Sequence, residues 1–193
     1  RTNELNPLRF KINPNLPNNR DIVFETFIFD KSSQDTARQT IVINVENGIE
    51  LGGIINDTLT LYPNKFYIVT SNLFLSETAV LNILPGTIIR FGEGRAILSY
   101  GIINAVGNKD SMIILTAVGG WWGGINFSNP SATFKYCEFS RISAEYMPPH
   151  TGGYYENCIF KDNEYWTMFL NSNLVNCNWY SNRGGYTMAI WGG

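Results

Sequence analysis

A repeat of about twenty residues constrains the fold of this chain more than any other feature of its sequence. Three segments align on their cysteines: 134–139 (FKYCEF), 155–160 (YENCIF) and 174–179 (LVNCNW). Each unit has a bulky apolar residue, two spacers, a cysteine, one spacer and an aromatic residue, and the cysteines are 21 and 19 residues apart. Such a period indicates a repeat fold, in which each unit buries its apolar face only by stacking on the next.

The spacing within each unit predicts which side chains face the core. The cysteine and the aromatic residue stand two positions apart, so both point to one face of a strand. The predicted inward column is Cys137, Cys158 and Cys177, and the predicted outward column is Glu138, Ile159 and Asn178. Three positions separate the first apolar residue from the cysteine, so the chain must turn a corner between them.

Asparagines recur at two places in the repeat. Asn157 and Asn176 precede the cysteines, and asparagine tolerates the left-handed backbone conformation that suits a sharp corner. Asn163 and Asn182 form a second column, in which we expect the side-chain amides to hydrogen-bond from coil to coil.

A further column links 124–127, 166–170 and 186–191, with Met168 aligned on Met188. The segment from Ile142 to Gly153 contains Pro148 and Pro149, and we expect it to be a coil with an irregular loop. β-Branched and aromatic residues dominate the apolar runs, which favours strands over helices. The sequence therefore predicts an all-β stack of parallel coils, each rising by one strand spacing of ~4.8 Å.

Residues 79–91 (AVLNILPGTIIRF) resemble the opening coil of right-handed parallel β-helix proteins with the pectate-lyase-like fold, which often show an L-x-I-x-P-G-x-x-x-x-F pattern. Segments 100–107 (YGIINAVG), 113–116 (IILT) and 122–127 (WGGINF) are similar to later strands of that family. The resemblance extends from about Tyr67 to the end of the chain and implies a right-handed parallel β-helix. Family members include polysaccharide lyases, glycoside hydrolases, adhesins and other surface proteins, so the fold alone does not select a function.

The first part of the chain, residues 1–58, lacks the repeat. Ile22–Phe29 and Thr40–Val45 are predicted strands, separated by a polar turn from Asp30 to Gln39. The segment is too short for an immunoglobulin-like sandwich of ~100 residues. We expect either the last strands of such a sandwich or a small sheet that caps the β-helix, which we assign to residues 59–193. Because Trp191-Gly-Gly repeats Trp122-Gly-Gly at the very end, we expect a β-helix truncated at its C-terminus.

Composition and charge exclude several functions. Charged residues make up 16% of the chain, and the formal net charge of −2 comes without a cluster of Lys or Arg, so nucleic acid is not an expected partner. Apolar runs are shorter than the ~18–20 residues of a membrane span, so we predict no transmembrane segment. The family resemblance implies an extracellular or bacterial cell-surface location.

The sequence offers little for catalysis. His150 is the only histidine, and we interpret it as a loop residue. Asp162 and Glu164 lack a stacked acidic partner, although glycosidases and calcium-dependent lyases need several carboxylates. We therefore predict no catalytic residue, no metal site and no cofactor. The cysteines are expected to be free, buried thiols, because stacked strands are ~4.8 Å apart whereas disulfide Cβ atoms are ~3.8 Å apart.

Aromatic residues provide the candidate binding site. All five Trp lie at or after residue 121, and exposed aromatic faces can stack on sugar rings. We predict Trp179 in the core, and we predict ligand binding by Trp121, Tyr154, Tyr165 and Tyr180.

The preferred hypothesis is a non-catalytic β-helix module of a secreted or cell-surface bacterial protein, adhesive or binding a polysaccharide or other glycan. One alternative is part of a polysaccharide lyase or glycoside hydrolase whose catalytic residues lie outside this sequence. Another is an accessory region of a secreted peptidase.

Overall fold

The computed structural model describes residues 20–30, 32, 36–45, 48–127, 132–143, 145, 152–164, 168–170, 172–183 and 189–191, with the backbone alone for Asn44, 168–170 and 189–191. All elements in these ranges are β-strands. The chain divides into two compact units, Arg1–Asn47 and Gly48–Gly193. The all-β class predicted from the repeat is confirmed.

The N-terminal unit contains a two-stranded antiparallel sheet. Strand β1 (Arg20–Phe29) pairs with β2 (Thr36–Val45) without a register shift. Alternation of apolar residues places the Ile22–Ile43 and Phe24–Ile41 pairs on the same face. Both predicted strands are confirmed, and the connecting turn is shorter than predicted because β2 already begins at Thr36.

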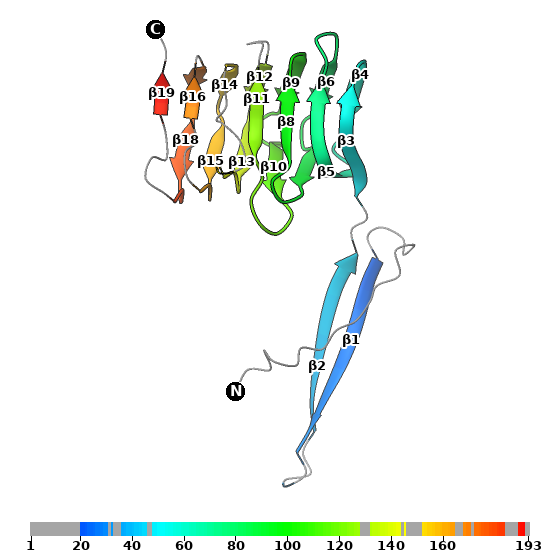
Figure 1. Cartoon of the computed structure of the whole chain (residues 1–193). Coiled ribbons are helices and arrows are strands. Elements are labelled where there is room, and N and C mark those ends of the chain that lie inside the picture. Colours follow the sequence, from blue (N-terminus) through cyan, green and yellow to red (C-terminus); the bar gives the residue numbers. More distant parts are fainter. Residues whose placement is uncertain are drawn as a thin grey trace. The chain divides into compact units, whose positions relative to one another are not determined.

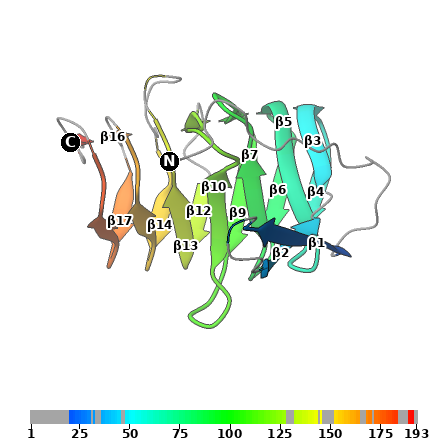
Figure 2. The same cartoon turned by 90° about the horizontal axis from the view of Figure 1, so that it is seen from below.

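The second unit is a parallel β-solenoid of about five turns, with its strands stacked in sequence order along one axis (Figure 1). Each full coil contributes strands to up to three ladders. The first ladder contains β3 (Ile49–Ile55), β5 (Phe66–Leu75), β7 (Ile88–Phe91), β10 (Ile113–Ala117), β13 (Cys137–Ser140), β15 (Ile159–Lys161) and β18 (Asn178–Tyr180). Figure 2 shows β7, β10 and β13 of this ladder side by side.

The other two ladders complete the coils. The second contains the C-terminal halves of β3 and β5, followed by β8 (Ala96–Ser99) and β11 (Gly124–Phe127). The third contains β4 (Thr58–Leu61), β6 (Val80–Ile83), β9 (Ile102–Val106), β12 (Ala132–Lys135), β14 (Tyr154–Glu156) and β17 (Asn173–Val175). Strand β16 (Met168–Leu170) pairs separately with β19 (Ala189–Trp191).

One continuous core fills the inside of the coils. In β7, Ile89 and Phe91 are buried while the residues between and before them are partly exposed, as expected for a strand with one face on the core. Phe91 stacks on Trp122 of the next coil, with ring centroids 4.0 Å apart. The Trp122 indole Nε1–H donates to the Ser140 carbonyl at 2.8 Å, so its polar atom is satisfied inside the core.

The predicted register of the cysteine repeat is confirmed. Phe139 pairs with Phe160 and Phe160 with Trp179, and the same three residues form an inward aromatic stack with centroid distances of 4.9 and 5.1 Å. Phe134 similarly pairs with Tyr155, and their rings stack at 4.9 Å. Trp179 packs against the core, as predicted.

Two corners of each later coil use left-handed backbone conformations. Tyr136, Asn157 and Asn176 have φ angles of 51°, 54° and 50°, which confirms the predicted corner before each cysteine. The other corner, between the first and second ladders, has Arg141, Asp162 and Ser181 at φ angles of 60°, 52° and 56°.

The second asparagine column links successive coils through the backbone. The Asn182 Oδ1 accepts the Asn163 backbone N–H at 2.9 Å, and its Nδ2 donates to the Phe160 carbonyl at 3.0 Å. Asn163 makes the equivalent bonds to the Ile142 N–H and the Phe139 carbonyl, at 2.8 and 3.3 Å. The predicted coil-to-coil bonding is confirmed, with backbone groups as the partners of the amides.

Two details differ from the sequence predictions. Strands β3 and β4 pair in parallel with β5 and β6, so the solenoid begins near Gly48 and not at residue 59. This first coil has none of the cysteines and asparagines that identify the later ones. Met168 pairs with Ala189, whereas the sequence alignment placed it on Met188. The segment after Arg183 is longer than the equivalent segment after Glu164, so a constant period gave the wrong alignment.

Candidate functional site

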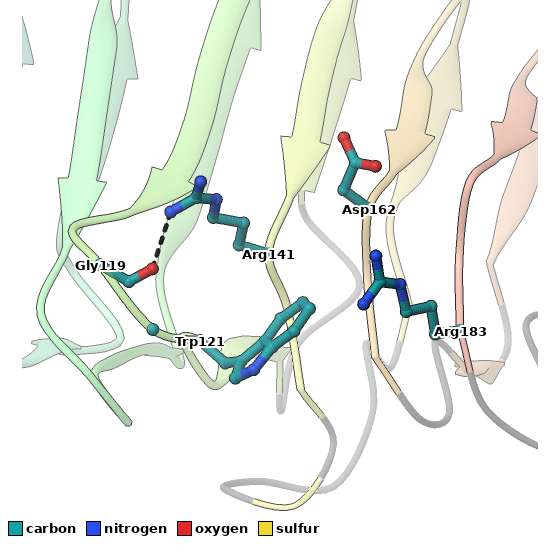
Figure 3. Close-up of a pocket in the computed structure, with 6 residues that line it drawn as sticks. Gly119, Trp121, Arg141, Asp162 and Arg183 are labelled. Carbon is teal, nitrogen blue, oxygen red and sulfur yellow. Dashed lines mark hydrogen bonds between the residues drawn. The ribbon is translucent and has the colours of Figure 1, made fainter. Parts of the chain in front are cut away.

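A hollow opens on the outer surface beside the second ladder, after β11. Beside this strand, the described residues of successive coils are joined by single parallel bridges. Trp122 pairs with Ile142, Ser143 pairs with Glu164, and Glu164 pairs with Arg183. The hollow has a volume of about 390 Å³ and is lined by Gly119, Gly120, Trp121, Arg141, Asp162 and Arg183 (Figure 3). These residues come from four successive coils.

Two adjacent tryptophans face opposite ways at this place. Trp122 is buried in the core, whereas Trp121 is half-buried and lines the hollow. The loop that carries Trp121 is joined to the preceding coil, because the Gly94 N–H donates to the Trp121 carbonyl at 2.9 Å. Among the described residues, the indole of Trp121 has no stacking or hydrogen-bonding partner. Its N–H group is therefore unpaired within the described chain, and part of the indole is open to the hollow.

Glycines before Trp121 shape this loop. Gly119 has a φ of +84°, a conformation that residues with a side chain rarely adopt. A Cβ atom at Gly120 would lie 3.2 Å from the carboxyl carbon of Glu93, in the coil before. The loop can therefore pass close to the neighbouring coil and still present Trp121 outward.

Three charged side chains complete the site. Arg141 Nη1 donates to the Gly119 carbonyl at 2.7 Å, which holds one guanidinium group at the edge of the hollow. The side chains of Asp162 and Arg183 are exposed and make no hydrogen bond or ion pair within the described part of the chain. In Figure 3 the guanidinium group of Arg183 points into the same space as the Trp121 indole. Two positive charges and one negative charge thus line the hollow.

The backbone at Arg141 and Asp162 is strained. A left-handed conformation costs a residue with a Cβ atom roughly 1–2 kcal/mol, and glycine or asparagine is the usual solution. Here the chain places an arginine and an aspartate at two of these corners. The corner of the next coil has Ser181 in the same conformation outside the hollow, so the left-handed backbone is a property of the coil corner.

The three predicted ligand-binding residues that the structure describes are not brought together. Trp121 lines the hollow, and Tyr180 lies 49% exposed on β18 in the first ladder, next to Lys161. Tyr154 lies on β14 in the third ladder, on another side of the coil. Tyr165 and the loop residue His150 lie outside the described residues.

Tyr154 belongs to a small ion-pair cluster. Lys135 Nζ lies 2.7 Å from a Glu156 carboxylate oxygen and 5.5 Å from the centre of the Tyr154 ring, and the Tyr154 hydroxyl donates to Glu156 at 3.1 Å. The hydrogen bond with Lys135 lowers the pKa of Glu156, and the same bond raises the pKa of Lys135. These contacts give Tyr154 a structural role on the outer surface of the third ladder.

Sequence reasoning missed Arg141 and Arg183, and considered Asp162 only as one half of a carboxylate pair. The signal was present in the repeat: Arg141 and Asp162 each stand two positions after the inward aromatic, Phe139 or Phe160. Arg183 lies outside this column, two positions after Ser181. The closeness of the column to Trp121 depends on the bridge between Trp122 and Ile142, which joins the two segments.

The cysteine column has the chemistry of a core. All three cysteines are free thiols; Cys137 and Cys158 are buried and Cys177 is half-buried. The hydrogen bond with the Cys137 thiol, more than burial, raises the pKa of Cys158 to about 12. The hydrogen bond with Cys158 raises the pKa of Cys177 as well. Protonated thiols are poor nucleophiles and poor metal ligands, so these residues act in packing.

The described residues contain no group of three or more His, Cys, Asp or Glu side chains placed to hold a metal ion. A helix that could cross a membrane was likewise not found in this part of the chain.

Comparison with known proteins gives no significant match to a family model, a curated protein or a solved structure. The parallel solenoid is thus established by the strand pairing of this chain itself.

Proposed function

We propose that this chain is a non-catalytic, glycan-binding module of a secreted or cell-surface bacterial protein, and that it binds its glycan in the hollow at Trp121. The observation that carries the proposal is the partly exposed, unstacked indole of Trp121, with charged side chains from the next three coils beside it. A flat aromatic face covers the apolar face of a sugar ring, while Arg and Asp hydrogen-bond its hydroxyl groups.

The scaffold supports this function. Each lining residue belongs to a coil with paired strands, so the backbone of the site is held in place before a ligand arrives. Such preorganisation reduces the entropy lost on binding. The resemblance of residues from about Tyr67 onward to pectate-lyase-like proteins agrees with a polysaccharide ligand and an extracellular location.

Binding without catalysis fits the side chains in the hollow. Glycoside hydrolysis uses two carboxyl groups, and a calcium-dependent lyase needs several carboxylates around the ion. The hollow has one carboxylate, Asp162, while Glu138 on the first ladder is paired with Lys161 at 2.8 Å. The alternative of a polysaccharide lyase or hydrolase requires catalytic residues beyond those of the hollow.

A polysaccharide array tests the proposal directly. We expect the protein to retain at least one glycan, with and without Ca²⁺, and expect Trp121→Ala to weaken that binding about tenfold or more, which is ~1.4 kcal/mol or more. The matched control is Tyr100→Ala, which removes an exposed aromatic residue outside the hollow. Equal binding by wild type and Trp121→Ala would contradict the proposed site. Release of unsaturated sugars would instead favour the lyase alternative.

A further inference from the structure

We propose that one face of the N-terminal two-stranded sheet binds a second copy of this chain, so that two chains form a dimer with two-fold symmetry. This face, which we call the open face, is the side of the β1–β2 sheet on which Val23 and Val42 form a cross-strand pair. It belongs to the N-terminal unit, so the dimer is independent of the hollow in the solenoid. Exposed apolar side chains and two opposite charges on the open face carry the proposal.

The two faces of this sheet differ in exposure. Side chains alternate between the faces along each strand, so the open face receives positions 23, 25, 27 and 29 of β1 and positions 36, 38, 40 and 42 of β2. The large apolar side chains among them are all 55–59% exposed: Val23, Phe27, Phe29 and Val42. On the opposite face Ile22, Phe24 and Ile43 are half-buried, while Ile28 and Ile41 are 65% and 44% exposed. The open face is therefore the side on which every large apolar residue is uncovered.

The sheet itself gains from a cover on this face. Among the described strands, β1 and β2 pair only with each other. A two-stranded sheet is at best marginally stable in water, because one pair of strands buries little apolar surface. Removal of the open face from water would supply the missing apolar burial. A second copy is one cover that is always present at the concentration of the chain.

The area of the open face is close to what a dimer needs. A phenylalanine buries ~150–250 Å² when it leaves water completely, so the two phenylalanines and two valines expose roughly 400 Å² of apolar surface on each copy. A specific interface buries ~800 Å² on each partner, and a little more than half of that area is apolar. Two open faces packed together therefore provide the apolar area of a specific interface near its usual size.

The charges in the middle of the open face complement each other. Glu25 and Arg38 lie on opposite strands at adjacent pairs of this face, Glu25 opposite Thr40 and Arg38 opposite Phe27. Both are exposed, and the guanidinium carbon of Arg38 lies 5.2 Å from the centre of the Phe27 ring. Asp21 is a second acid, at the end of the same face.

Two-fold symmetry makes use of this pair of charges. In a two-fold interface the same patch occurs on both partners, so a residue that contacts another across the interface is contacted by it in return. Glu25 of each copy can therefore meet Arg38 of the other copy, in two equivalent ion pairs. A central charge of one sign would instead repel a second copy. The open face thus fits its own copy in both apolar area and charge.

Sedimentation velocity of the whole chain tests the proposal. Over a concentration range from about 1 to about 200 µM, we expect the mean mass to rise from that of the 21.8-kDa monomer toward that of a dimer. A chain that stays monomeric over this range would overturn the proposal. A continuous series of larger oligomers would also overturn it, because a two-fold interface closes after two copies.

A pair of matched variants tests which face is used. Phe29→Asp places a charge on the open face and should weaken the dimer tenfold or more. Ile28→Asp is the control, because it places the same charge at the neighbouring exposed position on the opposite face, and it should change the affinity by less than about threefold. If both variants lose the dimer, or both keep it, the open face is not the interface.

A mixing experiment tests the ion pairs and leaves every apolar side chain in place. Glu25→Arg gives a chain with two central positive charges, and Arg38→Glu gives a chain with two negative ones, so each variant alone should dimerise tenfold or more weakly than the wild type. An equimolar mixture of the two should dimerise with nearly wild-type affinity, since opposite charges then meet across the interface. Both positions are exposed, and circular dichroism verifies that each variant is folded. A mixture no more dimeric than its components would overturn the two-fold arrangement.

Discussion

The two halves of the solenoid are built by different rules. From β3 to β11 the core is mainly aliphatic, as at Leu61, Val69 and Leu81, and glycines such as Gly86 and Gly94 take the left-handed turn positions. From β13 onward, stacked aromatics and thiols fill the core, and residues other than glycine take the left-handed corners. Both halves nevertheless extend the same first ladder.

The two halves also differ in how regular the length of their coils is. In the early half successive coils vary in length: Ile88 pairs with Phe66 on one side and with Ile114 on the other, 22 and 26 residues away. In the late half the steps are 21 and 19 residues, with the same roles at the same positions. A regular corner places successive side chains in a column along the axis. The candidate site uses Arg141 and Asp162 of one such column, together with Trp121 from the last coil of the early half and Arg183, which lies two positions after Ser181.

If the late half depends on its aromatic stack, Phe160→Ala should be the most damaging change. Phe160 is fully buried between Phe139 and Trp179, and removing a buried phenylalanine costs about 3–5 kcal/mol. The control Ile159→Ala alters the neighbouring outward residue and should cost less than about 1 kcal/mol. Denaturant unfolding measures both variants. Equal losses would mean that the inward stack is not what stabilises these coils.

Asn163→Ala tests the asparagine column and should have the next largest effect. Without the side chain, the Ile142 N–H loses its partner inside the protein and the Phe139 carbonyl loses one hydrogen bond. An unsatisfied buried group costs about 1–3 kcal/mol, so we expect a loss of about 2 kcal/mol.

The early half provides the control for this column. Asn82 accepts a hydrogen bond from Asn104 at 3.0 Å on the outer surface of the third ladder. Because both amides can bond to water there, Asn82→Ala should cost no more than about 0.5 kcal/mol. A loss at Asn82 as large as that at Asn163 would show that surface amide stacking also stabilises the solenoid.

The contrast between the early and late halves also explains which coils could be predicted from the sequence. The cysteine and asparagine repeat predicted the late register residue by residue, because identical roles recur at nearly constant intervals. The first coil was missed because Ile49–Leu61 carries only aliphatic alternation, which many folds share. Of the site, Trp121 was predicted from its aromatic type. The arginines were not, because their proximity to Trp121 depends on strand bridges that no local pattern encodes.

The thiol column predicts a loss of stability at alkaline pH. The Cys158 thiol has a pKa of about 12 in the folded chain and ~8.5 in the unfolded chain. Between these two pH values the unfolded state loses the thiol proton while the folded state keeps it. Its contribution to stability is complete below pH ~8.5 and falls as the pH rises, by about 2 kcal/mol at pH 10. Cys177 and Tyr155, whose pKa values are also raised, act in the same direction.

Denaturant unfolding between pH 7 and 10 measures this effect. The slope of stability against pH should be smaller in Cys158→Ala, which keeps the rest of the column. In the native state at pH 8, a thiol-specific reagent should leave Cys137 and Cys158 unmodified, since both are buried. A stability that stays constant up to pH 10 would show that these thiols do not control the alkaline behaviour.

The smallest effect should come from relaxing a corner. Ser181 has a φ of 56° and occupies the corner of Arg141 and Asp162, but it does not line the hollow. Ser181→Gly removes the steric cost of the left-handed conformation and adds entropy to the unfolded chain, so we expect a net gain of about 0.5 kcal/mol.

The reverse change, Gly94→Ser, introduces that steric cost in the early half, where φ is 68°, and should lower the stability by about 1 kcal/mol. Glycan binding by Ser181→Gly should equal that of the wild type. If Ser181→Gly is destabilising, the late corners are not strained.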